Sequence, residues 1–216
     1  MVLQQQEHST RQRLIEAAGQ LFAEKGFNGT SIRQVCAQAK VNLSAVDYHF
    51  GGKEGLYAST CIYVLDRRNK AIPLDGGFRI DTSASGRLRA FIQSYMARTC
   101  DLKRPLWEQQ LIHREMMNPT PIARGIIAST MSEEVQTLKA IIRDIAGSKM
   151  DDDQLELCVL SIMGQCHFHA HYRRYKATGL QWPHLLTKTN KDIAEHISRF
   201  SLAGIQSAPP GTASGS

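Results

Sequence analysis

The chain of 216 residues lacks any apolar run near the length of about 18–20 residues that a helix needs to cross a bilayer. Its first nine residues, MVLQQQEHS, are polar and lack the apolar core of a secretory signal peptide. Only five cysteines occur, at positions 36, 61, 100, 158 and 166, and none forms a CxxC pair. A scattered, odd set indicates reduced thiols rather than a disulfide framework or a structural zinc site. We therefore expect a cytoplasmic protein.

Motifs of catalysis are also missing. The sequence has no Gly-rich phosphate loop, no GxSxG and no HExxH. The pair Glu133–Glu134 falls on a predicted exposed helix face and is interpreted as solvated. Strand-like alternation is absent, whereas the apolar residues, 42% of the chain, recur mostly at steps of three and four. These absences predict an all-α protein that is not an enzyme and carries no cofactor.

Net charge says little about the partner. The whole chain carries +6, but its first 55 residues carry only +1, six minus five. The six cations are Arg11, Arg13, Lys25, Arg33, Lys40 and Lys53, and the five acids are Glu7, Glu16, Glu24, Asp47 and Glu54. Any case for nucleic acid therefore depends on where these charges lie.

The segment 30–56 reads as two short helices joined by a turn. Thr30 or Ser31 caps the first, because a hydroxyl there accepts a free backbone N–H. Asn42 is the predicted cap of the second, and a third helix starts at Lys53. The inward faces consist of Ile32, Val35, Cys36 and Ala39, and then Leu43, Val46 and Phe50. Two small helices crossed over a tight turn form a helix-turn-helix, whose second helix enters the DNA major groove.

A longer helix precedes this segment. Its apolar stripe has helical spacing, and Gly26 after Lys25 is a typical left-handed C-cap, which Phe27 then seals. The stripe, predicted to be core, is Leu14, Ala17, Ala18, Leu21 and Phe22. The run AKVNLSAVDYHFGGKEGL, residues 39–56, resembles the DNA-binding signature of the tetracycline-repressor (TetR) family, and LIEAAGQLFAEKGFNGTS, residues 14–31, resembles that family's first helix.

Helical periodicity continues through the rest of the chain. It predicts helices over about 53–70, 86–101, 104–117, 121–146, 152–176 and 183–202. Asp151–Asp153 at the start of the fifth of these, and Arg173, Arg174 and Lys176 at its end, complement the helix dipole. Gly179 ends that helix, and Pro183 fits the first turn of the last one.

The resemblance implies about nine helices in two parts. An N-terminal three-helix head binds DNA, and a C-terminal body binds a ligand and dimerises through its last two helices. The runs REMMNPTP, residues 114–121, and GQCHF, residues 164–168, resemble the CerR-like subgroup. The expected boundaries are a flexible arm over 1–9, the head over 10–55, the body over 56–203 and a disordered tail over 204–216.

The family's pattern also assigns the DNA-facing residues. Lys53 and the free N–H groups of its helix form an anion site suited to a DNA phosphate. The predicted set is Thr30, Ser31, Arg33, Asn42, Leu43, Ser44, Ala45, Asp47, Tyr48, His49 and Lys53. Two departures from the family stay open. Asp47 either accepts a bond from a cytosine or pairs with Arg33, and Lys40, where glycine is common, either adopts a left-handed conformation or reshapes the turn.

Two sets of body residues are further candidates. An inducer pocket is predicted from Trp107, Leu111, His113, Met116, Met117, Ile127, Met131 and Phe168. A dimer interface is predicted from Cys158, Ile162, Cys166, His169, Ile193, Ile197 and Phe200. His167 and His171 have a spacing that can bind metal, as do Cys166 and His169, but no further ligand lies near them in sequence, so we predict no metal site.

The combined expectation is a homodimeric bacterial regulator, a repressor, that binds a palindromic DNA operator and is released by a small-molecule inducer. A second reading is an architectural or adaptor protein that binds DNA without a ligand. A regulator should lose DNA affinity when its ligand binds, whereas an adaptor should not.

Overall fold

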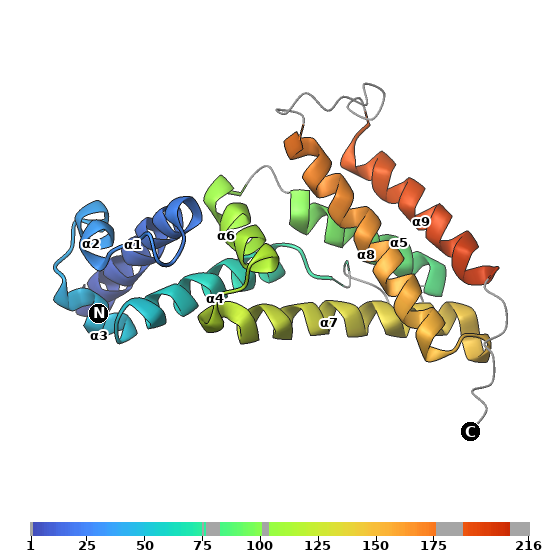
Figure 1. Ribbon diagram of the computed structural model, residues 1–216, viewed down its shortest axis with the longest axis horizontal. Helices are drawn as coiled ribbons and strands as arrows, with labels where there is room; N and C mark the ends of the chain where they lie inside the picture. Colours follow the sequence, from blue (N-terminus) through green and yellow to red (C-terminus); the bar gives the residue numbers. More distant parts are fainter. Residues whose placement is uncertain (1, 75, 77–82, 101–103, 176–187, 208–216) are drawn as a thin grey trace. The chain divides into compact units, whose positions relative to one another are not determined.

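The computed structural model describes residues 2–74, 76, 83–100, 104–175 and 188–207 (Figure 1). Over these ranges the chain forms nine α-helices and one short 3-10 helix, and no β-strand. None of these helices combines the length and the apolar character that a membrane span requires. The predicted all-α class is confirmed. The chain divides into two compact units, Met1–Arg68 with Leu102–Met131, and Asn69–Asp101 with Ser132–Ser216.

The first unit contains the predicted head and three further elements. Its helices are α1 (Val2–Lys25), α2 (Ile32–Ala39), α3 (Ser44–Phe50), most of α4 (Lys53–Ala71), α6 (Leu106–Met117) and the start of α7 (Pro121–Ala146). Helix α1 extends back through the expected flexible arm, because no proline or glycine interrupts residues 2–18. It ends where Gly26 takes a left-handed conformation, with φ of 74°, as predicted.

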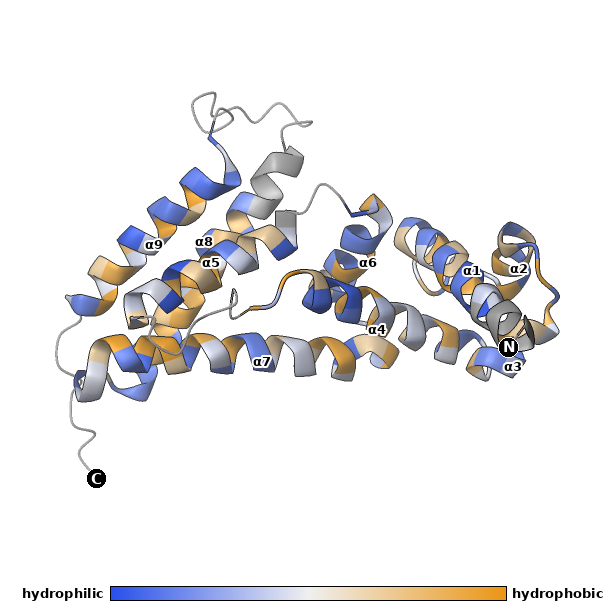
Figure 2. Ribbon diagram, turned by 180° about the vertical axis from the view of Figure 1, so that it is seen from behind, coloured by the Kyte–Doolittle hydropathy of each residue, from blue (hydrophilic) through white to orange (hydrophobic). Residues whose placement is uncertain are grey.

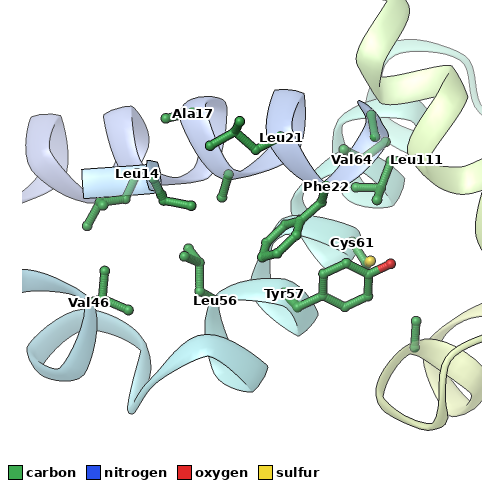
Figure 3. Close-up of a cluster of buried hydrophobic side chains, with 14 of the residues drawn as sticks. Leu14, Ala17, Leu21, Phe22, Val46, Leu56, Tyr57, Cys61, Val64 and Leu111 are labelled. Carbon is green, nitrogen blue, oxygen red and sulfur yellow. The ribbon is translucent and has the colours of Figure 1, made fainter. Parts of the chain in front are cut away.

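One apolar core joins these helices (Figure 3). The predicted stripe of α1 is buried throughout, as are Val46 of α3 and Leu56 of α4. Phe22 and Tyr57 are fully buried and meet edge to face, with ring centroids 4.6 Å apart. Each such side chain contributes about 1.5–3 kcal/mol through burial. This core fixes the position of the two short helices α2 and α3.

Buried carboxylates of α6 add polar contacts to that core. Glu108 is fully buried and accepts bonds from Arg67 (2.7 Å) on α4 and from Arg104 (2.6 Å). Glu115 is also fully buried, and it accepts a hydrogen bond from the Tyr57 hydroxyl. Because each carboxylate has partners, burial does not leave either of them unsatisfied.

The second unit is formed by α5 (Ala84–Cys100), the rest of α7, the 3-10 helix η1 (Gly147–Lys149), α8 (Asp152–Tyr175) and α9 (Asn190–Gln206). Helix α5 packs against both α8 and α9. Apolar and polar residues alternate around these helices (Figure 2). The fully buried residues of this core include Phe91, Ile92 and Ile142.

Two sequence expectations for this unit need correction. Glu134 was interpreted as solvated but is 4% exposed, because it forms an ion pair of 3.3 Å with the equally buried Arg98. The last described helix begins at Asn190 rather than near Pro183, since Thr189 and Asp192 form a capping box there. Pro183 itself, Gly179 and most of the expected tail lie outside the described residues.

Candidate nucleic-acid interface

The helix-turn-helix forms as the sequence predicts. Ser31 caps α2: its hydroxyl accepts the Gln34 N–H, and the Gln34 side chain accepts the Ser31 N–H in return. At the other end Lys40 adopts the left-handed conformation, with φ of 54° and ψ of 52°, and its N–H bonds to carbonyls of the last turn. Of the two readings left open for Lys40, the left-handed one is correct.

The start of α3 differs from expectation. Asn42 was the predicted cap, but the helix begins at Ser44 and no side chain caps it. Backbone carbonyls of Asn42 and Leu43 instead accept the first N–H groups, at 3.1 Å each. Leu43, predicted to point inward, is 49% exposed because it precedes the first helical turn, whereas Val46 is fully buried.

The outer face of α3 presents polar side chains to solvent. Ser44, Asp47 and Tyr48 are exposed, and Tyr48 reaches 73%. Among the ion pairs of the described residues, none joins Asp47 to Arg33. The Asp47 carboxylate lies instead near Gly52. Burial raises the pKa of the Cys36 thiol, and the nearby charge of Asp47 raises it further. Its carboxylate therefore remains open to a donor from outside the chain.

Thr30 does not belong to the exposed set. It is 2% exposed, and its hydroxyl donates to the carbonyls of Leu21 (3.2 Å) and Gly26 (2.9 Å). This side chain ties the end of α1 to the start of α2 and is not available to a ligand. Its neighbour Ser31 is exposed, and so is Arg33.

Lys53 stands at the first turn of α4, as predicted. Its ammonium lies 4.4 Å from the centroid of the Phe27 ring, a cation–π contact that holds the lysine stem in place. Gly51 and Gly52 precede it with φ of 69° and 113°, conformations that favour glycine. His49 is half-buried, and its ring meets that of Tyr48 edge to face at 4.9 Å.

A surface hollow of about 550 Å³ lies beside α3. Its lining contains residues of the α2–α3 turn and of α3 that the sequence assigned to DNA, together with residues that it did not. The lining residues are Thr10, Arg13, Lys40, Val41, Asn42, Ser44, Ala45, Tyr48 and His49. Thr10 and Arg13 were missed because they lie some 30 residues before α3 along the chain. Their three-residue spacing on an exposed helix face was the available signal.

The predicted dimer residues are mostly core residues. Ile162, Cys166, Ile193 and Ile197 are at most 7% exposed and pack inside the second unit. The structure does not support these four assignments, because side chains packed into the core of their own chain leave little surface for contact with a second subunit. Cys158 and His169 are half-buried, and only Phe200 is well exposed, at 64%.

Helices α8 and α9 expose other apolar side chains. Leu157, Leu160 and Phe168 fall on one face of α8 at steps of three and eight, and they are 62%, 69% and 49% exposed. On α9 the ring of Phe200 stacks on His196, with centroids 6.3 Å apart. The two helices pack against each other in the second unit (Figure 1).

The predicted inducer residues occupy different environments. Leu111 and Ile127 belong to the first core, whereas Met117 and Met131 are 65% and 37% exposed. Trp107 and Met116 pack at the edge of that core, and the Trp107 ring contacts α1 at Gly19, where a Cβ would lie 2.1 Å from it. His113 is half-buried in the first unit, and Phe168 belongs to the second. As a set they do not identify a cavity.

The histidine-rich run of α8 has a structural role in the described part. The Tyr95 hydroxyl and the His167 Nε2 lie 2.6 Å apart in a hydrogen bond that joins α5 to α8. Within the described ranges of the chain, no three His, Cys, Asp or Glu side chains are placed to share a metal ion. The side chain of His171 lies outside the described residues.

Comparisons with known proteins assign both parts of the chain. Residues 14–60 match the family described as "Bacterial regulatory proteins, tetR family", and residues 84–205 match "HTH-type transcriptional dual regulator CecR, C-terminal domain". The second match covers more than half of the chain. The subgroup that the body resembles is therefore CecR, and this name replaces CerR, the name expected from the sequence.

Individual relatives agree with these matches. The chain is 27% identical over 208 residues to the HTH-type transcriptional repressor NicS of Pseudomonas putida. The aligned region covers 94% of this chain and 95% of NicS. It is 48% identical to the probable HTH-type regulator YttP of Bacillus subtilis, but over 48 residues only, 22% of this chain and 23% of YttP. AibR, solved with isovaleryl coenzyme A and operator DNA, has the same fold, with a TM-score of 0.61 at 15% identity over 88% of this chain and 97% of AibR.

Proposed function

The chain belongs to the TetR family of bacterial transcriptional regulators, with a C-terminal domain of the CecR type, and on this premise we propose that it is a homodimeric repressor released from a palindromic operator by a small-molecule inducer. It acts in the bacterial cytoplasm. The proposal that the protein binds DNA is supported by the exposed outer face of α3. A cation flanks this helix on each side: Lys40 in the turn before it and Lys53 at the start of α4.

Each head places α3 in a major groove. Ser44 and Ala45 are small enough for close approach, and Ala45 can meet a thymine methyl. Tyr48, His49 and Lys53 then bind backbone phosphates, which fix the register but carry no sequence information. Asn42 and Asp47 are left to read base edges.

Dimerisation supplies two heads for the two half-sites. We assign it to the exposed apolar faces of α8 and α9, around Leu157, Leu160, Phe168 and Phe200, in place of the buried residues that the sequence suggested. An unpaired apolar face of this kind is typical of a protein–protein interface. A two-fold pair of heads requires a palindromic operator.

The inducer acts through α6, which contacts both α1 and α4. Arg114 of α6 donates to the carbonyls of Ala23 (3.4 Å) and Glu24 (3.2 Å) at the end of α1. Glu115 binds the Tyr57 hydroxyl of α4, and both groups are fully buried. A ligand that moves α6 therefore moves the head, and ligand and DNA oppose each other's binding reciprocally. The inducer and its contact residues stay a prediction.

Duplexes selected from a random library by the purified protein test this proposal. We expect the recovered sites to be palindromic and bound at one dimer per site, with affinity that falls steeply as salt rises. Thermal-shift screening of small molecules then identifies candidate inducers, which should raise the Kd for the selected duplex. If the protein selects no motif, it is not a sequence-specific regulator. If it binds a motif but none of the ligands that stabilise it lowers its affinity for that motif, it fits the adaptor reading.

A further inference from the structure

Lys40 holds a conformation that a lysine seldom adopts. It is the one non-glycine residue with positive φ among the residues that the structure describes. Within the described structure, the Lys40 side chain forms no hydrogen bond or ion pair. Only its backbone N–H is bonded, to carbonyls at the end of α2. Glycine takes this left-handed position without the steric cost of a Cβ. A strained residue at an exposed turn is a reason to look for a role outside the fold.

The surroundings of Lys40 are suited to an anion. The hollow beside α3 contains the cations Lys40 and Arg13, the hydroxyls of Thr10, Ser44 and Tyr48, and no carboxylate in its lining. Arg13 is exposed, and its guanidinium donates to the Thr10 hydroxyl at 3.4 Å; both residues line the hollow. Two cations and several hydroxyls around one concave surface match the donor set that binds phosphate.

We propose that Lys40 and Arg13, with Thr10, form a phosphate-binding cleft that grips the DNA backbone beside α3, and that the strained turn is kept for this contact. The inference rests on the proposed DNA-binding function and adds a site to it. It differs from the Lys53 site, because the Lys53 ammonium is held over the Phe27 ring at the start of α4. The backbone of the duplex would then be held by α1 and the turn as well as by α4.

The strain gives this proposal an unusual signature, since fold stability and DNA binding should respond with opposite signs. Lys40→Gly relieves the left-handed strain and removes the charge. We expect its melting temperature to rise by about 2–4 °C, the shift that a small gain in stability produces in a protein of this size. We expect its DNA affinity to fall, and the slope of log K against log salt to shrink by about 0.9 per head.

Companion variants separate charge from backbone shape. Lys40→Asn tolerates the left-handed conformation but has no charge, so it should lose the same slope, whereas Lys40→Arg should keep it. Arg13→Gln should lose about 0.9 per head by itself, and about 1.8 together with Lys40→Asn. Lys25→Gln is the matched control, an exposed lysine at the other end of α1, about 22 Å along the helix from Thr10. It should leave the slope unchanged.

The duplexes selected by the wild-type protein serve as probe for every variant. If the wild type binds with a steep salt slope and the Lys40 and Arg13 variants keep that slope, the cleft is refuted while the proposed function stands. A wild type that binds no duplex overturns both. A Lys40→Gly variant that binds DNA as well as the wild type overturns the link between strain and function, whatever its melting temperature.

Discussion

The buried carboxylate of Glu108 offers a sharp test of how the first unit is held together. Its side chain is 0% exposed and accepts three bonds, from Arg67 at 2.7 Å and from two nitrogens of Arg104 at 2.8 and 2.6 Å. These bonds join α6 to α4 and to Arg104 in the segment that precedes α6. Glu108→Gln keeps the volume of the side chain and removes its charge, so packing changes little.

The expected loss of stability follows from the exposure of the two partners. Arg104 is only 8% exposed, so the substitution leaves a buried cation without its counter-ion, which costs about 3–5 kcal/mol in comparable cases. Arg67 is 48% exposed, so solvent screens its ion pair with Glu108, and losing that pair costs only about 0–1 kcal/mol. Arg104 keeps one bond to the Val64 carbonyl, and glutamine can still accept from Arg104. We therefore expect the low end, about 3 kcal/mol.

Urea denaturation followed by helical circular dichroism measures this loss at fixed protein concentration. Glu156→Gln is the matched control, because Glu156 also pairs with one cation, Lys139, but is 59% exposed. It should cost no more than about 1 kcal/mol. If Glu108→Gln costs no more than Glu156→Gln, burial does not strengthen this ion pair and the reasoning is refuted.

Three further outcomes are expected. The double variant Leu160→Glu, Phe200→Glu should sediment as a folded monomer, because both side chains are exposed. Ile162→Glu should instead unfold the body, because it buries an unpaired charge in the core. If the double variant is still a dimer, the interface lies elsewhere. Asp47→Ala should relax base preference at one position per half-site by about 1–3 kcal/mol, and identical motifs selected by mutant and wild type would contradict this. Burial and the nearby charge of Glu115 raise the pKa of the Cys61 thiol to about 12 from an ordinary 9.0. The folded state thus binds this proton more tightly, so the free energy of unfolding should fall as pH rises from about 9 toward 12, by at most about 1.4 kcal/mol per pH unit, and Cys61→Ala should show a weaker dependence in urea titrations.

The sequence by itself determined the elements that depend on local interactions. The Ser31 cap, the Gly26 C-cap and the buried stripe of α1 all follow from spacing and from side chains within a few residues of one another. Most of the predicted helix bounds agree with the described helices for the same reason. The helix-turn-helix motif is likewise local, so DNA binding could be predicted before any contact was known.

Tertiary structure decided which apolar and charged side chains are buried. Helix α8 is apolar on two faces, and only packing against α5 and α9 shows that Ile162 points inward and Leu160 outward. Glu134 is buried because Arg98, 36 residues earlier, neutralises it. Helical periodicity carries no information about partners so far apart in sequence.

The same limit applies to the candidate DNA interface. The sequence left two conformations open for Lys40, since its left-handed strain is small enough for the surrounding structure to impose. It also gave no reason to join Arg13 of α1 to that turn. The α1–α2 packing brings the two cations to one hollow, because burial of the shared core fixes where the ends of these helices lie.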